Sequence, residues 1–258
     1  KYWELYDRSK IHPAANADRP GGAPEIAFHD GREIRRSFKS RPGGTPTRED
    51  AVALRHGYFA NTSYMDAQLG KVIDELDRLD LAKNTIIVMW SDHGFHLGEN
   101  GLWAKTSNFE LDARVPLIIA TPDHAGGQRS PSLAELLDLY PTVVELCGLD
   151  PPGHLEGKSL VPILRNPTTK VKDAAYTWHP RPAYPPNGEN PTVMGYSMRT
   201  ENYRFTEWRK FETNEIVATE IYDHRHDPAE TNNLASRSPK ALKAQLAKLL
   251  ARSLLNQE

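Results

Sequence analysis

The sequence predicts an α/β fold: a mixed sheet flanked by helices, followed by a small α+β subdomain with an antiparallel sheet and a C-terminal helix. Three observations predict it. A long helical pattern leads into the apolar run Thr85–Trp90, which lacks polar alternation and is typical of a strand buried on both faces, as in a parallel sheet. Short strands separated by turn residues follow later, and leucines at helical spacing end the chain. We therefore expect two units, residues 1–165 and 166–258.

The composition excludes several classes of protein. The chain has 258 residues, of which 38% are hydrophobic and 26% are charged, and its net charge is -2. These values predict a folded protein without a nucleic-acid footprint or a basic patch for a membrane surface. No apolar run approaches the roughly 20 residues that span a bilayer. Cys147 is the only cysteine, so no internal disulfide is expected, and its apolar neighbours predict a buried, inert thiol.

The first 48 residues form the least regular part of the sequence. The chain begins at Lys1 without an initiator methionine or a signal peptide, and we expect that it begins inside a longer protein. Residues 12–48 are rich in proline, glycine and arginine, with clusters at Arg19–Gly22 and Arg41–Gly44. They predict an irregular surface connection with one short turn of helix near Ile34. Its basic residues could face an anionic substrate, although a solvated loop is favoured.

A long helix is predicted to begin at Thr47, because Thr47 and Asp50 resemble a capping box. His56, Tyr58 and Tyr64 lie on this helix as packing or surface residues. Apolar residues repeat at helical spacing and predict one buried face that packs on the sheet: Met65, Leu69, Val72, Ile73, Leu76 and Leu79.

Polar residues follow the first apolar strand at its carboxyl end, where ligands bind in open α/β sheets. They are Ser91, Asp92, His93 and Gly94. Asp92 and His93 are potential metal ligands. The same residues could instead form a simple turn in which Asp92 bonds to nearby backbone amides. These four residues alone leave both alternatives open.

The second half of the chain predicts further helices and a small antiparallel sheet. Pro141 fits the first turn of a helix that Gly148 stops, and a linker spans residues 151–167. Turn residues separate four short strands, at 174–179, 193–199, 203–208 and 220–223. Ser238 and Pro239 cap a last helix. One face of this helix predicts a cover for the sheet: Leu242, Leu246, Leu249 and Leu250.

Three motifs stand in a fixed order in the middle of the chain. S-D-H-G is followed by the loop motif G-E-x-G-x-W-A-K, which ends at Lys105, and then by V-P-L-I in an apolar strand at 115–120. This ordered set resembles the sulfatases of the alkaline-phosphatase-like superfamily, most nearly the iduronate 2-sulfatase branch. A second set near the C-terminus resembles a sulfatase signature that we interpret as structural: Tyr222, Asp223, Asp227, Pro228, Glu230, Asn233 and Leu234.

The resemblance implies a site for the hydrolysis of a sulfate monoester. Asp92 and His93 match two ligands of a calcium ion. Since calcium prefers oxygen ligands, His93 could instead touch the nucleophile or the sulfate. Lys105 matches the lysine that contacts the sulfate group and is the catalytic candidate, with Trp103 beside it as a substrate-binding candidate. The alternative for Lys105 is an ordinary solvated lysine.

The resemblance also implies that parts of the site lie outside this chain. A sulfatase nucleophile is a formylglycine made from the cysteine of C-x-P-S-R, whereas Cys147 is followed by G-L-D. The paired aspartates that complete the metal site of the family are absent too. In the family these parts come first, so we expect the chain to be the C-terminal part of a sulfatase, inactive alone, with the N-terminal part as its partner. The family implies a secreted, periplasmic or lysosomal protein.

The implied substrate is a sulfated saccharide, such as a uronic acid or a glycosaminoglycan. His179 and Arg181 could reach toward an anionic sugar, or they could hold the two units together. Two other functions stay open. One is a phosphate-ester hydrolase or transferase of the same superfamily with zinc or manganese. The W-A-K motif around Lys105 favours a sulfate ester over a phosphate ester as the substrate. The other is a non-catalytic carbohydrate-binding remnant, suggested by the missing nucleophile.

Overall fold

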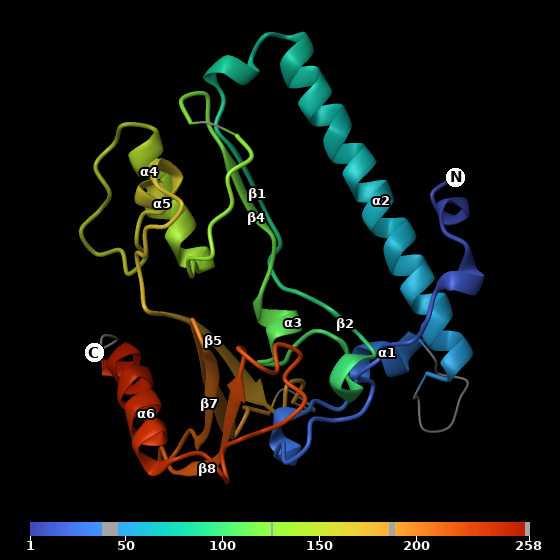
Figure 1. The fold of residues 1–258 in the computed structure, drawn as a ribbon, viewed down its shortest axis with the longest axis vertical. Helices are drawn as coiled ribbons and strands as arrows, with labels where there is room; N and C mark the ends of the chain where they lie inside the picture. The colour runs from blue at the N-terminus through green and yellow to red at the C-terminus, as the bar shows by residue number, and fades with distance from the viewer. Residues whose placement is uncertain (38–45, 125, 186–188, 256–258) are drawn as a thin grey trace.

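The computed structural model describes residues 1–37, 46–124, 126–185 and 189–255. The predicted basic cluster Arg41–Gly44 lies outside these residues. Figure 1 shows a long helix along one side of the molecule, a narrow two-stranded ribbon through its middle, and a four-stranded sheet at its base. The C-terminal helix stands beside the sheet (Figure 1). The protein therefore has the mixed α/β architecture with antiparallel sheets and a C-terminal helix.

The N-terminal segment packs against both the long helix and the sheet. Its described part contains short helical elements, which are Trp3–Leu5, Arg8–Lys10, Glu25–Ala27 and α1 (Arg32–Ser37). The helix α1 confirms the helical turn expected near Ile34. The ring of Trp3 stacks on the buried ring of His56, with 3.7 Å between their centroids.

The long helix α2 (Arg48–Arg78) begins with the predicted capping box. The amide of Asp50 donates to Oγ1 of Thr47, and the amide of Thr47 donates to Oδ2 of Asp50. The predicted buried face is wrong: Met65, Val72 and Leu79 are 50%, 58% and 48% exposed, and the other three residues of the face are only half-buried. The reason is that α2 packs through its first turns and then extends away from the N-terminal segment (Figure 1).

The central strand is β1 (Ile87–Trp90), and its partner is β4 (Leu117–Ala120). They pair antiparallel, with Trp90 opposite Leu117. The prediction of a strand buried on both faces, as in a parallel sheet, is therefore wrong for the described chain. Trp90 and Ile118 are 49% and 53% exposed. An apolar run specifies a strand but not the direction of its partner, and a two-stranded ribbon leaves both of its faces open.

In chain order, two helices stand between the ribbon and the C-terminal sheet. α4 (Leu139–Leu146) matches the predicted helix, and Gly148 follows it with a φ of 72°. Cys147 is exposed rather than buried, because it caps the end of α4 instead of lying inside it. The predicted linker contains a further helix, α5 (Val161–Arg165). None of the described helices combines the length and the apolar character needed to cross a membrane.

The predicted antiparallel sheet and its helix are confirmed. The strands, in spatial order, are β5 (Ala174–Arg181), β6 (Val193–Thr200), β7 (Tyr203–Lys210) and β8 (Ile216–Asp223). The helix α6 (Lys240–Leu255) covers one face, where Leu246 and Leu250 pack on Phe205. On the other face, Trp208 packs with Phe109. Both faces are thus buried, and the second face connects the sheet to the loop that follows β1.

Candidate functional site

The residues that follow β1 form a tight polar turn. Asp92 places its carboxylate in solvent, with 82% of the side chain exposed, and its Oδ1 accepts a hydrogen bond from the amide of His93 at 3.0 Å. Nε2 of His93 lies 3.6 Å from Oδ2 of Asp92. The hydroxyl of Ser91 donates to the carbonyl of His93 at 2.7 Å. The two predicted metal ligands are therefore neighbours at one exposed point.

The tautomer of His93 follows from its backbone contact. Nδ1 of His93 lies 2.8 Å from the carbonyl oxygen of Gly94. A carbonyl only accepts hydrogen bonds, so Nδ1 carries the proton in this contact, and Nε2 of the neutral ring keeps its lone pair. Metal-bound histidines commonly hold their second nitrogen in this way. The side-chain geometry of Asp92 and His93 is thus compatible with a cation.

Gly94 lets the turn approach the next helix, α3 (Glu110–Ala113). Its amide donates to the carbonyl of Asp112 at 2.8 Å, and the amide of Phe95 donates to that of Leu111 at 2.9 Å. A Cβ on Gly94 would lie 1.8 Å from the carbonyl oxygen of Leu111. Only glycine fits this contact, which fixes the turn against α3.

A buried pair of side chains, His96 and Asp112, supports this turn. Nδ1 of His96 lies 2.9 Å from Oδ1 of Asp112, and the amide and the hydroxyl of Ser107 donate to Oδ2 of Asp112. Burial raises the pKa of Asp112, but the hydrogen bonds from His96 and Ser107 outweigh burial and hold that pKa below its usual value. The charged carboxylate therefore connects β2 (His96–Leu97) to the start of α3.

Lys105 follows β3 (Trp103–Ala104), which pairs with β2. Both of its neighbours have a left-handed backbone: φ is 66° at Ala104 and 81° at Thr106. Such conformations cost about 1–3 kcal/mol each in residues other than glycine, and they gather at functional sites. Nζ of Lys105 lies 3.0 Å from Oε1 of Glu33 on α1. The hydrogen bond with Glu33 is the chief cause that raises the pKa of Lys105, and the charge of Asp92 contributes.

Arg181 lies inside the molecule rather than over a pocket, with 5% of its surface exposed. Its guanidinium donates to the carbonyls of Ile26, Ala27 and Thr106 at 2.9, 2.8 and 3.1 Å. Burial lowers its pKa to about 10. These contacts favour the second role considered for Arg181, which is to hold the N-terminal segment and the loop after Lys105 on the sheet.

His179 and Trp103 are the two remaining substrate-binding candidates. Burial, with a smaller effect of the Arg181 charge, lowers the pKa of His179 to about 4, so its ring is neutral at pH 7. The charge of Asp112 acts in the opposite direction and raises this pKa. Trp103 is half-buried, and its ring lies over Gly98, where a Cβ would come within 3.1 Å of it. The substrate-binding roles of these residues remain predictions.

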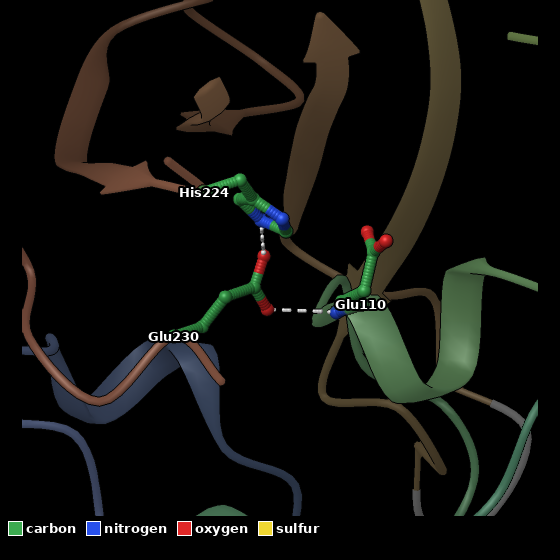
Figure 2. Close-up of side chains that lie close together, drawn as sticks. All are labelled: Glu110, His224 and Glu230. Atoms are coloured by element: carbon green, nitrogen blue, oxygen red, sulfur yellow. Dashed lines mark hydrogen bonds and ion pairs between the residues drawn. The ribbon is translucent and has the colours of Figure 1, made fainter. Parts of the chain in front are cut away.

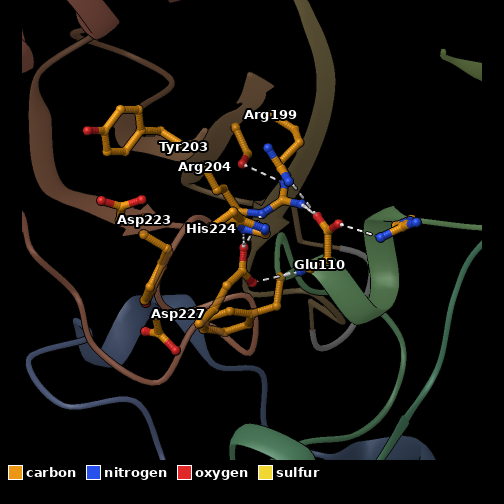
Figure 3. A network of polar contacts seen from close by, with 12 residues as sticks. Glu110, Arg199, Tyr203, Arg204, Asp223, His224 and Asp227 are labelled. Atoms are coloured by element: carbon orange, nitrogen blue, oxygen red, sulfur yellow. Dashed lines mark hydrogen bonds and ion pairs between the residues drawn. The ribbon is translucent and has the colours of Figure 1, made fainter. Parts of the chain in front are cut away.

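A different cluster of potential metal ligands lies at the edge of the sheet. Among the described residues, Glu110, His224 and Glu230 alone place three such groups within 4.8 Å of one another. Figure 2 shows Glu230 between the ring of His224 and the amide of Glu110. Figure 3 shows Arg204 beside Glu110 in this cluster. Because Arg204 lies 2.6 Å from Glu230 and 2.5 Å from Glu110, we conclude that this cluster is not a metal site. The guanidinium supplies the positive charge that a cation would bring.

The same network explains the C-terminal signature. Burial raises the pKa of Glu230, but the charge of Arg204 and the hydrogen bond from His224 outweigh burial and lower it. Asp227 accepts hydrogen bonds from the amides of Thr231 and Asn232, both through its carboxylate. These contacts fix the loop that follows β8, as expected of structural residues.

Asp92 and His93 are the two residues predicted to bind calcium, and that role stays a prediction. Calcium usually takes six to eight oxygen ligands. One exposed carboxylate and one imidazole nitrogen fit a part of such a site. No motif pointed to Glu33 or Asp112, because their partners, Lys105 and His96, lie 72 and 16 positions away in the chain.

Comparison with known families decides the assignment. Residues 25–149 match the profile "Sulfatase", and residues 98–256 match "N-sulphoglucosamine sulphohydrolase, C-terminal". The chain belongs to the sulfatase family. Members of this family generally use a metal ion together with a formylglycine residue. The second match spans the sheet β5–β8 and α6, so both parts of this chain correspond to parts of a sulfatase.

Individual relatives agree with this sulfatase assignment. Human iduronate 2-sulfatase is 31% identical, over 92% of this chain and 55% of that protein. A solved structure described as a complex with its substrate D-glucosamine-2-N,6-O-disulfate is 28% identical, with a TM-score of 0.66 over 88% of this chain and 44% of that one. A phosphonate monoester hydrolase from Silicibacter pomeroyi is 26% identical, with a TM-score of 0.75 over 99% and 52% of the chains. The chain thus spans about half the length of these relatives.

Proposed function

We propose that this chain is the C-terminal part of a sulfatase that hydrolyses sulfate monoesters of a sulfated saccharide, such as a uronic acid or a glycosaminoglycan. The observation that carries the proposal is the geometry around Lys105. Its ammonium group lies at an exposed face between two residues with strained backbone, and the carboxylate of Asp92 contributes to its charge state. The similarity to human iduronate 2-sulfatase and to a complex with a disulfated glucosamine supports this substrate class.

In this proposal each predicted residue has a role. Lys105 binds a sulfuryl oxygen and stabilises the charge that develops there, as a positioned cation does in a partly dry site. Asp92 and His93 are two ligands of a calcium ion, and Nε2 is the coordinating atom of His93. Calcium would neutralise sulfate charge, and a formylglycine in the preceding part of the polypeptide would supply the nucleophile. Trp103 and His179 lie on the side of the site where the sugar of the substrate binds. Arg181 holds the loop after Lys105 in place.

The proposed N-terminal part also has a place to pack. The second half of α2 and both faces of the β1–β4 ribbon expose large apolar side chains, including Val72, Trp90 and Ile118. Apolar side chains gathered on neighbouring elements mark an interaction surface. In this proposal residues 1–165 complete the large α/β domain together with that part, and residues 166–258 form the small subdomain.

The test is desulfation by the full-length protein. Lys105→Ala is expected to lower kcat/KM for a sulfated sugar by about 10² to 10³, the usual loss when one donor to a developing oxyanion is removed. The matched control is Lys248→Ala, which removes an exposed lysine of α6 and is expected to leave the rate unchanged. Normal turnover by Lys105→Ala would refute the role of Lys105.

A phosphonate or phosphate monoester hydrolase is the second candidate, because a phosphonate monoester hydrolase shares the fold over 99% of this chain. Comparing kcat/KM for a sulfate ester and a phosphonate ester of the same alcohol separates the two. Preference for the phosphonate, together with bound zinc or manganese, would favour this candidate. Sugar binding without turnover of either ester would favour a carbohydrate-binding remnant.

A further inference from the structure

A carboxylate lies beside Lys105 and comes from a distant part of the chain. Glu33 stands on α1, and its Oε1 and Oε2 atoms lie 3.0 and 3.2 Å from Nζ of Lys105. The two residues are 72 positions apart, so only the tertiary structure brings them together. Each side chain keeps 34% of its surface exposed. A ligand that meets Lys105 therefore also meets Glu33.

This pair differs from an ordinary surface pair. Lys210 and Glu215 are five positions apart across a strand turn and are 48% and 60% exposed, and such pairs contribute little to stability. Glu33 and Lys105 are more enclosed. They are flanked by Tyr184, which hydrogen-bonds to Glu33 and follows β5 in the chain. Three separate segments thus supply an anion, a cation and a phenol to one exposed point.

The carboxyl group of Glu33 is ionised at neutral pH. Burial raises its pKa, but the hydrogen bonds with Lys105 and Tyr184 outweigh burial and hold the pKa below its usual value. An ionised carboxylate accepts hydrogen bonds and donates none. It therefore attracts a hydroxyl group and repels a second anion, and the repulsion between two charges a few ångströms apart is large at a partly buried site.

We infer that Glu33 determines specificity at the proposed sulfatase site: it accepts a hydrogen bond from a sugar hydroxyl next to the bound sulfate, and it disfavours a second anionic group there. The inference rests on the proposed function of Lys105. The ammonium of Lys105 has three N–H donors, so it binds a sulfuryl oxygen while it keeps Glu33. A sugar with an anionic group on the adjacent ring position would bring like charges together, and such repulsion is a common source of specificity.

The experiment uses Glu33→Gln in the full-length protein, which removes the charge and preserves the size of the side chain. The probes are a hexose with one sulfate and the same hexose with sulfates on two adjacent positions. Calorimetry gives both dissociation constants. Glu33→Gln is expected to raise the affinity for the disulfated probe about tenfold relative to the monosulfated probe, as removal of one close repulsion predicts.

The control is Glu201→Gln, which removes the carboxylate of the exposed pair with Lys170. Glu201 follows β6 at the end of the sheet opposite Arg181, so its loss is expected to leave the ratio of affinities unchanged. Lys105→Ala separates the two claims. If it weakens both probes while Glu33→Gln leaves the ratio unchanged, the inference about Glu33 alone is overturned. If Lys105→Ala weakens neither probe, the proposed sulfate contact and the inference both fail.

Discussion

His29 and His179, two half-buried histidines, lie beside Arg181 and are neutral at pH 7. Burial, followed by the charge of Arg181, lowers the pKa of each ring from 6.5 to about 4. In His29 the ring has a fixed orientation, because Nδ1 accepts a hydrogen bond from the amide of Gly31 at 3.0 Å. The folded protein thus keeps both rings uncharged in a range of pH where the unfolded chain protonates them.

This difference makes stability depend on pH. The unfolded state binds more protons than the folded state between pH 6.5 and about 4, so the free energy of unfolding is expected to fall as the pH falls through this range. The contribution of His29 is on the order of 2 kcal/mol after allowance for its partial exposure. Urea unfolding at several pH values measures it.

The matched variants isolate His29. His29→Asn keeps an acceptor near the position of Nδ1 but does not titrate, and we expect a smaller loss of stability between pH 6.5 and 4. His154→Asn, which replaces an exposed ring, is the control and is expected to keep the slope of the parent protein. An unchanged slope in His29→Asn would contradict the assignment.

At the scale of an element, the start of α2 is a local device that the sequence specifies. Thr47→Ala removes the side chain that accepts from the amide of Asp50. We expect a loss of about 1 kcal/mol in the free energy of unfolding, typical of a lost N-cap. Thr62→Ala is the control. Thr62 is exposed in the same helix, and its hydroxyl donates a hydrogen bond to the carbonyl of Tyr58, four residues earlier. Equal losses in the two variants would show that the capping box contributes nothing.

At the scale of the whole molecule, the network around Arg204 joins segments that are far apart in the chain. Arg204 is buried between Glu110, the first residue of α3, and Glu230 after β8. Glu230→Ala leaves this guanidinium without one of its two carboxylate partners. Breaking a buried pair from one side costs about 3–5 kcal/mol, so a large loss of stability is expected, measured by denaturant unfolding.

The control for this prediction is Glu215→Ala. It removes one half of an exposed pair with Lys210, and a loss of less than about 1 kcal/mol is expected. A similar small loss in Glu230→Ala would contradict a stabilising role of the network. A loss that depends on added divalent cations would contradict our conclusion that this cluster is not a metal site.

Local patterns predicted most elements of the fold. The four strands of the C-terminal sheet followed from the turn residues that separate them, and the leucine face of α6 followed from helical spacing. Both signals depend on near neighbours in the chain. The pairing of β1 did not follow, because an apolar run carries no information on the direction of its partner. The exposure of Cys147 was also not predicted. Whether a helix ends one residue earlier or later decides whether a residue lies inside the helix or caps its end, and a sequence pattern does not locate that end to a single residue.

For the candidate site, the motifs placed Asp92, His93 and Lys105 in sequence, and their roles stay predictions. What no motif indicated is the surrounding support. Gly94 fits α3 only because its backbone meets Leu111, and Lys105 pairs with Glu33 on a helix 72 positions earlier.

The sequence by itself determined the elements, their caps and the order of the motifs, because these depend on short-range backbone preference and side-chain periodicity. Only the tertiary structure decided that the buried Arg181 donates hydrogen bonds to three carbonyls of distant segments, and that the carboxylate of Glu33 lies beside Lys105. The physical reason is that both contacts join segments separated by many residues. Such contacts form only when the packing of the sheet and the N-terminal segment brings those segments together.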